Sequence, residues 1–308
     1  MVPRIDPNNM ADIITTLINE IGPGHMASTA YDTAWAARLD EIAPSISASA
    51  LAWLTKNQLP DGTWGAPAPM YYHDRVVCTL AAMIALERRG HREADKEQII
   101  KGKLALERIV SEATGGLSSD PNGATVGFEM IAPTLVAEAE NLGLIKNQAN
   151  RILGRISKQR AVKLAYLKDN MISRHVTMAF SAEMAGVDGK HMLDVDNLQE
   201  SNGSVGVSPS ATAYFATYIK KGDEAALAYL RNTMKADGSF PNVAPFDVFE
   251  IGWALWNLSL IPGLAQHARA RARARDMARG QHRARAGRRD RAVDDARGGQ
   301  DLQRSPWR

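Results

Sequence analysis

The sequence predicts an all-α protein built from helical hairpins, and three observations indicate this fold class. Apolar residues gather in runs of helical length, and no segment sustains the alternation of a strand. Prolines and glycines fall between the expected helices. A short turn motif also recurs along the chain. Repeated helical hairpins bury the faces that their neighbours expose, and they commonly close into an α/α barrel, which we expect here.

The clearest expected helix is the run from Val76 to Leu86, which is apolar over three turns. The charged segment 87–89 follows it, and Gly90 comes next. We therefore expect a buried helix with cations in its last turn and a glycine stop. Further helices are expected over residues 126–144, 211–218 and 225–234.

The recurring turn motif occurs in the segments Gln58–Gly65, Gln199–Gly206 and Lys235–Phe240. Each places Asp-Gly or Asn-Gly before a small residue and then a large apolar one. Such a pattern predicts a turn with a positive φ at glycine, after which the apolar side chain folds back onto a helix. Any helical-hairpin protein contains turns of this kind, so the repetition is what supports the barrel.

The formal net charge of +3 averages two unlike regions. Residues 265–308 hold 13 Arg and five Asp with no Lys or Glu, a balance of +8, so residues 1–264 carry −5. The body therefore gives no reason to expect a nucleic-acid partner. The tail has no apolar face and is expected to be disordered or out of frame, because GC-rich DNA read in another frame encodes such a mixture. The alternative is a basic arm for nucleic acid or acidic membranes.

The remaining bulk properties point to the cytoplasm. The chain has one cysteine, Cys78, so a disulfide framework is excluded. No apolar run reaches about 18 residues, which argues against a membrane span. The first residues hold two prolines and lack the apolar stretch of a signal peptide.

Five segments together resemble the motifs of one enzyme family. They are Ser28–Trp35, Gln58–Gly65, Gly127–Leu135, Leu198–Ala213 and Pro241–Trp253. In this order they resemble a Tyr-Asp-Thr-Ala-Trp box, an Asp-Gly-Ser-Trp-Gly turn, a Gly-Phe-Glu segment, a Ser-Pro-Ser-x-Thr-Ala block and a Pro-Asn-Val segment. These are motifs of the class II diterpene cyclases, which the chain therefore resembles. Five motifs in the family's order over about 260 residues are far more specific than any one alone. The resemblance is to the amino-terminal portion, in bacterial tuberculosinyl, kolavenyl or copalyl diphosphate synthases.

This resemblance implies a domain arrangement and a reaction. Residues 1–30 would give the first helix of a β domain, residues 31–235 a γ-like α/α barrel domain, and residues 236–264 the return into the β domain; residues 265–308 are the Arg/Ala-rich tail. The implied substrate is geranylgeranyl diphosphate, which is protonated at its terminal alkene and cyclised to a bicyclic diphosphate, with Mg2+ assisting. Neither the sequence nor the resemblance indicates an oligomeric state.

Protonating an unactivated alkene requires a strong acid that is fixed in a dry cavity. The family uses a D-x-D-D or D-x-D-T-T motif, and this sequence contains neither. Asp194 and Asp196 spell the near match D-x-D-N, but two acids before a turn are also ordinary helix-terminus residues. We therefore assign no catalytic residue and expect a truncated, inactive copy.

The resemblance also supplies candidate ligands for Mg2+ and for the diphosphate. Asp120 and Glu129 are the metal candidates, and Lys163, Lys168 and Arg174 are the diphosphate candidates. The competing interpretation is structural: Asp120 would start a turn, Glu129 would form a buried hydrogen bond, and the cations would be solvated.

Two alternative functions stay open. One is a non-catalytic helical module that binds an isoprenoid or a partner. The other is a triterpene (squalene-type) cyclase relative, since those enzymes share the turn motif. A class I synthase is excluded, because its D-D-x-x-D cluster does not occur.

Overall fold

The computed structural model describes residue 16 and residues 26–90, 92–111, 117, 127–146, 152–154 and 156–260. The chain divides into two compact units. One spans residues 26–245, and the other combines residues 1–25 with residues 246–308. The predicted all-α class is confirmed, although the helices of the described part do not close into a complete barrel. The predicted tail, residues 265–308, lies outside the described residues.

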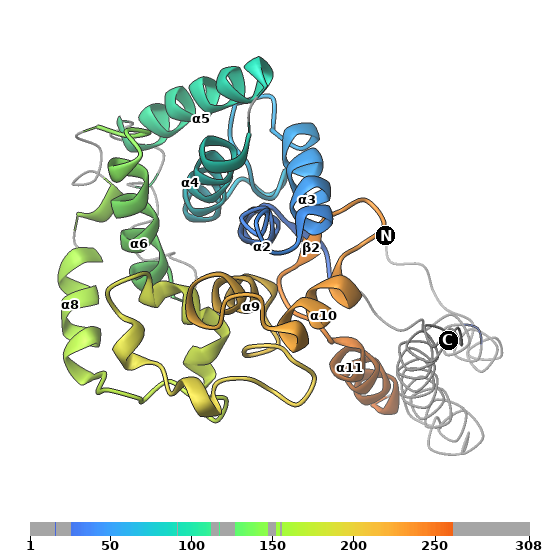
Figure 1. Ribbon diagram of the computed structural model, residues 1–308. Coiled ribbons are helices and arrows are strands. Elements are labelled where there is room, and N and C mark those ends of the chain that lie inside the picture. The colour runs from blue at the N-terminus through green and yellow to red at the C-terminus, as the bar shows by residue number, and fades with distance from the viewer. Residues whose placement is uncertain are drawn as a thin grey trace, which may run out of the picture. The chain divides into compact units, whose positions relative to one another are not determined.

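The elements of the larger unit follow in chain order (Figure 1). They are β1 (Ser28–Thr29), α2 (Ala30–Ala36), α3 (Pro44–Lys56), α4 (Tyr72–Arg89), α5 (Glu93–Ser111), α6 (Phe128–Asn141), α8 (Ile156–Tyr166), the 3-10 helices η3 (Thr177–Ala185), η4 (Lys190–Met192) and η5 (Val195–Asn197), α9 (Pro209–Tyr214), the π-helical turn η6 (Phe215–Ile219), α10 (Glu224–Thr233) and β2 (Phe240–Pro241).

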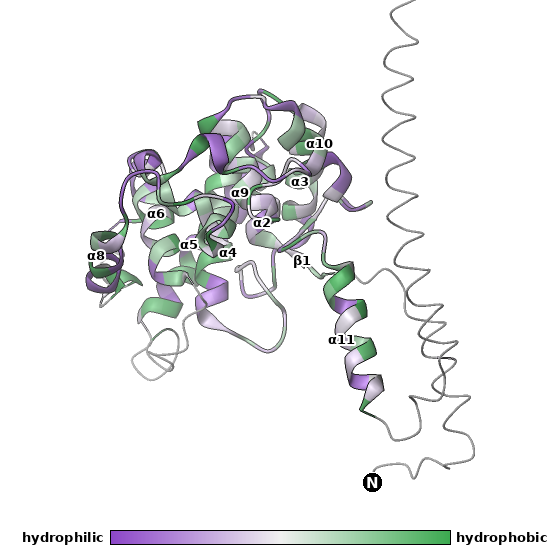
Figure 2. Ribbon diagram, turned by 90° about the horizontal axis from the view of Figure 1, so that it is seen from below, coloured by the Kyte–Doolittle hydropathy of each residue, from purple (hydrophilic) through white to green (hydrophobic). Residues whose placement is uncertain are grey.

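The short helix α2 is the centre of this unit, and all seven of its residues are buried. It packs against α3, α4 and α9, which surround it in Figure 1. Thr29 caps its first turn, because the Thr29 hydroxyl accepts a hydrogen bond from the backbone N–H of Asp32 at 3.1 Å. In Figure 2 hydrophilic residues colour much of α8, at the edge of the unit.

The two strands connect the beginning of this unit to its end. Ser28 pairs with Pro241 and Thr29 with Phe240 in an antiparallel register. The backbone N–H of Phe240 also donates to the hydroxyl of Thr33 at 3.0 Å. The chain therefore enters and leaves the unit at one place.

Helix α4 has the form that the sequence predicts. Its residues from Arg75 to Leu86 are all buried, Arg88 and Arg89 occupy the last turn, and Gly90 follows as the C-cap. A helix that is buried on every side is mostly apolar on every side. The unbroken apolar run from Val76 to Leu86 could therefore be recognised in the sequence. The other predicted helices correspond to α6, to α9 with η6, and to α10.

The three predicted turns share one structure. In each, an Asp or Asn side chain accepts hydrogen bonds from the residue two positions on, and the glycine has a φ of +86° or +87°. The apolar residues Trp64, Val205 and Phe240 are fully buried. A Cβ on Gly203 would lie 2.2 Å from the carbonyl oxygen of Ala225 in α10. Glycine is therefore required both for the turn and for the close approach to the next helix.

The prediction that proline and glycine stay outside the helices is wrong at three positions, one of which is Gly252 inside α11 (Asp247–Ser259). Pro133 lies inside α6 and Gly102 inside α5. A Cβ on Gly102 would lie 2.7 Å from the sulfur of Met83 in α4, so this glycine lets the two helices approach closely.

The described part of the smaller unit contains α11 (Asp247–Ser259). The rings of Phe249 and Trp253 stack on this helix, with 6.0 Å between their centroids. Among the described residues of the whole chain, no helix has both the length and the apolar character that a bilayer crossing requires.

Candidate functional site

A buried acidic cluster joins the start of α2 to the start of α9. Asp32 is completely buried, and its carboxylate accepts a hydrogen bond from the Thr29 hydroxyl at 2.6 Å. It also accepts from the backbone N–H of Ser210 at 3.2 Å and from the side-chain amide of Asn242 at 3.5 Å. One carboxylate thus ties together α2, α9 and the segment after β2.

Glu183, in η3, is the second acid of this cluster. Its Oε1 accepts a hydrogen bond from the Tyr31 hydroxyl at 2.8 Å and one from the Ser210 hydroxyl at 3.3 Å. Its Oε2 is buried and has no hydrogen-bond partner among the described residues. A buried carboxylate with one unsatisfied oxygen is costly when ionised, which favours the protonated form.

Burial raises the pKa of both acids. The pKa of Asp32 rises from 3.8 to about 6, and the pKa of Glu183 rises from 4.5 to about 7. Loss of hydration is the largest cause in each case, and hydrogen bonds to the carboxylates partly oppose it. The charge of Asp32 adds to the effect on Glu183. The protonated form of Glu183 is therefore favoured up to a higher pH than for a solvated glutamate.

This cluster is built to hold the fold in place. Tyr31, Asp32 and Trp35 are all buried, as residues that fix the packing of a fold commonly are. Each oxygen of Asp32 faces a protein hydrogen-bond donor, so neither is directed at a substrate. Trp64 likewise locks its own hairpin, because its indole N–H donates to the carbonyl of Leu54 at 2.9 Å.

Two of the candidate ligand residues meet in space. Glu129 lies in the first turn of α6, and Lys163 lies in the last turn of α8. Their side chains form an ion pair, with Glu129 mostly buried and Lys163 half-exposed. Gly127, with a φ of +82°, precedes α6 and directs the chain into it. A candidate metal ligand and a candidate diphosphate ligand thus occupy one place.

The other two candidate cations lie beyond the end of α8. Lys168 and Arg174 are both exposed. The Arg174 guanidinium donates to the backbone carbonyl of Gln199 at 3.5 Å. Neither is a member of the Glu129–Lys163 ion pair.

The D-x-D-N segment lies on a surface turn. Asp194 precedes the three-residue helix η5 and is partly exposed, and its carboxylate accepts hydrogen bonds from Asn197 at 3.0 and 3.2 Å. Asp196 is exposed. Both acids are accessible from the surface, whereas alkene protonation requires a dry site.

The structure describes only one of the two metal candidates, Glu129, because Asp120 lies outside the described residues. Within the described ranges no group of three or more His, Cys, Asp or Glu side chains is arranged to hold a metal ion. Glu129 is the one metal candidate with a described position, and it is engaged with Lys163.

Sequence reasoning missed Glu183, Ser210 and Asn242 as members of the acidic cluster. A signal existed for Glu183, which is the single charge in the apolar segment 176–187. A lone acid in such a segment must find buried hydrogen-bond partners. Its partner Tyr31 is 152 residues away in the chain, and no local pattern reveals such a pairing.

Comparison with known proteins adds a consistent group of relatives. No protein-family model matches the chain. Over 246 residues it is 51% identical to the Type B diterpene cyclase of Mycobacterium tuberculosis, a match that covers 79% of this chain and 49% of that protein. It is 34% identical over 253 residues to ent-copalyl diphosphate synthase 1 of Oryza sativa, covering 80% of this chain and 28% of that protein.

A solved structure matches the fold as well. The crystal structure of ent-copalyl diphosphate synthase from Arabidopsis thaliana, in complex with (S)-15-aza-14,15-dihydrogeranylgeranyl thiolodiphosphate, is similar with a TM-score of 0.70. The sequences are 28% identical, and the match covers 90% of this chain and 39% of that one. The chain thus spans about half the length of the mycobacterial relative and less of the two plant proteins.

Proposed function

We propose, from the premise that this chain is related to the class II diterpene cyclases, that it forms the part of such an enzyme that packs beside the proton-donating domain. The observation that carries this proposal is the 51% identity over 246 residues to a diterpene cyclase. In this proposal residues 31–235 are the γ-like domain, and residues 1–30 and 236–264 belong to the β domain. The compact unit of residues 26–245 has nearly these limits, which supports the division.

The proposed substrate is geranylgeranyl diphosphate, which the complete enzyme would protonate and cyclise to a bicyclic diphosphate. The Arabidopsis structure supports this substrate class, since it holds an aza analogue of geranylgeranyl thiolodiphosphate. The relatives named above are diterpene cyclases and copalyl diphosphate synthases, which favours this reading over a triterpene cyclase.

We place the diphosphate contact at Lys163, with Lys168 and Arg174 as the further candidates of the same segment. Lys163 is half-exposed, and its one ion-pair partner in the described part of the chain is Glu129. A phosphate group could replace that carboxylate on the ammonium, because both are anionic oxygen acceptors.

The described residues fit an Mg2+ ion only in part. Magnesium is usually held by one or two carboxylates together with substrate phosphates and water. Glu129 could be one such carboxylate once a diphosphate engages Lys163, and Asp120 would be the other. When bound, Mg2+ would neutralise diphosphate charge.

The proton donor must come from outside the residues described. The chain contains no D-x-D-D or D-x-D-T-T motif, and Asp32 and Glu183 are occupied by the hydrogen bonds that hold α2, α9 and η3 together. The purified chain, given geranylgeranyl diphosphate and MgCl2, should therefore form no bicyclic diphosphate. Mass spectrometric detection of that product would contradict this part of the proposal.

The diphosphate contact is tested by calorimetry on the full chain with inorganic diphosphate and MgCl2. Lys163→Met should abolish the binding heat, since it removes the ammonium donor. Lys158→Met is the matched control, because Lys158 is exposed on the same helix. Equal heats from the two variants, with unchanged circular dichroism, would remove Lys163 from the site.

A further inference from the structure

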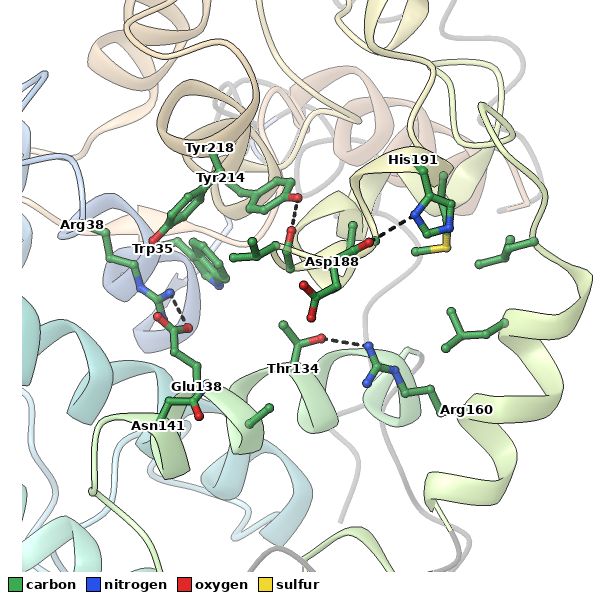
Figure 3. Close-up of a pocket in the computed structure, with 18 of the residues that line it drawn as sticks. Trp35, Arg38, Thr134, Glu138, Asn141, Arg160, Asp188, His191, Tyr214 and Tyr218 are labelled. Atoms are coloured by element: carbon green, nitrogen blue, oxygen red, sulfur yellow. Dashed lines mark hydrogen bonds and ion pairs between the residues drawn. The ribbon is translucent and has the colours of Figure 1, made fainter.

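The larger unit contains a cavity that the proposed reaction does not use. Its volume is about 660 Å3, within the range of pockets that enclose small organic ligands. Helices α2, α6 and α8, the loop 185–192 and the α9–η6 segment surround it (Figure 3). On α6 it is lined by Thr134 and Glu138, whereas Glu129 lies in the first turn. At 1.5 Å per residue, Glu138 lies about 13 Å along the helix from Glu129.

One wall of the cavity is aromatic. Trp35 meets the rings of Tyr214 and Tyr218 edge to face, with centroid separations of 5.9 and 6.5 Å. Figure 3 shows these three side chains together on one side of the cavity. Leu164 and Leu167 line it from the α8 side. Such walls favour an apolar body over water.

The cavity also has a fixed framework. The Tyr214 hydroxyl donates to the carbonyl of Gly186 at 2.6 Å, and the Thr134 hydroxyl donates to the carbonyl of Met184 at 2.8 Å. The loop that covers the cavity is therefore held from two sides. A ligand would meet walls that are already in place, which lowers the cost of binding.

The arginine, aspartate and glutamate side chains of the lining leave an excess of one positive charge. Three arginines, Arg38, Arg88 and Arg160, face two acids, Glu138 and Asp188. Arg38 and Arg88 share Glu138, at 2.9 and 2.8 Å from its two oxygens. The buried Arg38 guanidinium lies 3.9 Å from the Trp35 ring centre, and its Nε and Nη2 have no hydrogen-bond partner among the described residues. One acid thus serves two cations.

Arg160 is the cation that has no acid of its own. Its Nη2 donates to the Thr134 hydroxyl at 3.3 Å, and its buried Nε has no partner in the described part of the chain. Burial lowers the pKa of Arg160, so the surroundings disfavour its charge. In Figure 3 its guanidinium points from α8 toward Thr134, into the cavity. A partly buried cation with an unpartnered N–H and no anion weakens a fold, and a bound anion would relieve this.

We infer that this cavity binds an amphiphilic anion, with its apolar body against Trp35, Tyr214 and Tyr218 and its carboxylate or phosphate head on Arg160. The head could come from a prenyl diphosphate or from a fatty acid, because both present anionic oxygens on an apolar chain. The proposed head contacts Arg160, one turn from Lys163 on α8, and the inference does not depend on the proposed cyclase reaction.

The test is calorimetric titration of the full chain with palmitate, and of its Lys163→Met variant with palmitate and with geranylgeranyl diphosphate. The variant lacks the diphosphate contact proposed above, so the ligand that it binds identifies the source of the head. At least one should bind saturably. Inorganic diphosphate lacks the apolar body, and geranylgeraniol lacks the anionic head. Neither should compete for the site. Arg160→Met should weaken binding about tenfold or more, since it removes a charge-assisted hydrogen bond, whereas Arg160→Lys should retain most of the affinity.

Three further measurements show whether the ligand binds in this cavity and whether a loss of binding reflects unfolding. Lys163→Met, one turn away on α8, should leave palmitate binding unchanged. Val187→Trp, at an exposed residue of the lining, should fill the cavity and weaken binding without unfolding the chain. Arg160→Met should keep or raise the melting temperature, because it removes a partly buried cation that has no acid beside it.

Three results would overturn the inference. They are the absence of saturable binding by either amphiphile, equal affinity for geranylgeraniol, and an Arg160→Met variant that binds normally or melts several degrees lower.

Discussion

Replacing Glu183 with Gln should change how the stability of the fold depends on pH. Glu183→Gln keeps an acceptor for the Tyr31 hydroxyl, which donates to Glu183 at 2.8 Å, and has the shape of the protonated acid. The folded chain raises the pKa of Glu183 from 4.5 to about 7, mainly by burial. The folded state therefore binds this proton more tightly than the unfolded state does.

The sign and size of the effect follow from linkage. The contribution is fully present below pH 4.5 and is lost as the pH rises through about 7. At 1.36 kcal/mol for each pH unit of pKa displacement, the loss between pH 5 and pH 8 is about 2 to 3 kcal/mol. For a domain of this size that corresponds to a fall in Tm of about 5 to 10 °C. Asp32, whose pKa is also raised, adds a loss of the same sign at lower pH.

The assay is thermal unfolding by circular dichroism between pH 5 and pH 8. The unmodified chain should lose the stated 5 to 10 °C more than Glu183→Gln over this range. Glu140→Gln serves as the control, because Glu140 is an exposed carboxylate on α6 and should leave the pH dependence unchanged.

Parallel melting curves for the unmodified chain and Glu183→Gln would refute the reasoning. They would mean that the Glu183 carboxylate is solvated in the folded chain, or that a cation lies beside it in solution. A Glu183→Gln variant that melts several degrees lower at pH 5 would also count against it, because at that pH the two side chains should be equivalent.

Other substitutions test the packing. Gly203→Ala should cost about 3 kcal/mol or more by urea denaturation, because the new Cβ would lie 2.2 Å from a backbone oxygen at a φ of +87°. Gly222→Ala, with a φ of +73° and open space, should cost only about 1 to 2 kcal/mol, and equal costs would reject the close-approach argument. Arg38→Met should cost about 3 kcal/mol, because it breaks a buried pair with Glu138, whereas Arg88→Met, at the more exposed partner, should cost under about 1 kcal/mol. A larger loss of stability from Arg88→Met than from Arg38→Met would mean that Arg88 is the cation that stabilises Glu138.

Local patterns were enough to predict much of the fold. Helix α4 could be read because its burial on every side leaves an unbroken apolar run, and Gly90 ends it as a helix stop. The three turns could be read because a positive φ leaves few residue types available, and Gly62, Gly203 and Gly238 meet that requirement. In each case the physical cause lies within a few residues of its signature.

What the sequence could not give are the arrangements that join distant segments. Glu183 meets Tyr31, and Ser210 meets Asp32 from 178 residues away, through single hydrogen bonds that leave no periodic trace. Pro133 breaks the usual rule for helix interiors, and only the fold shows that α6 tolerates it.

The candidate site was predicted in part for the same reason. Lys163 and Glu129 were chosen separately, by resemblance, and the structure brings them into one ion pair. The cavity beside Arg160 could not be predicted, because its lining comes from segments between Trp35 and Tyr218 that meet only in the folded chain.

The account depends most on the claim that this chain can serve as the γ portion of a diterpene cyclase. The most direct measurement uses a chimera in which residues 26–260 replace the matching segment of the Type B diterpene cyclase of Mycobacterium tuberculosis. Supplied with geranylgeranyl diphosphate and MgCl2, the chimera should form a bicyclic diphosphate that mass spectrometry detects. A chimera that folds, with helical circular dichroism and a cooperative melt, yet forms no cyclised product would contradict the account.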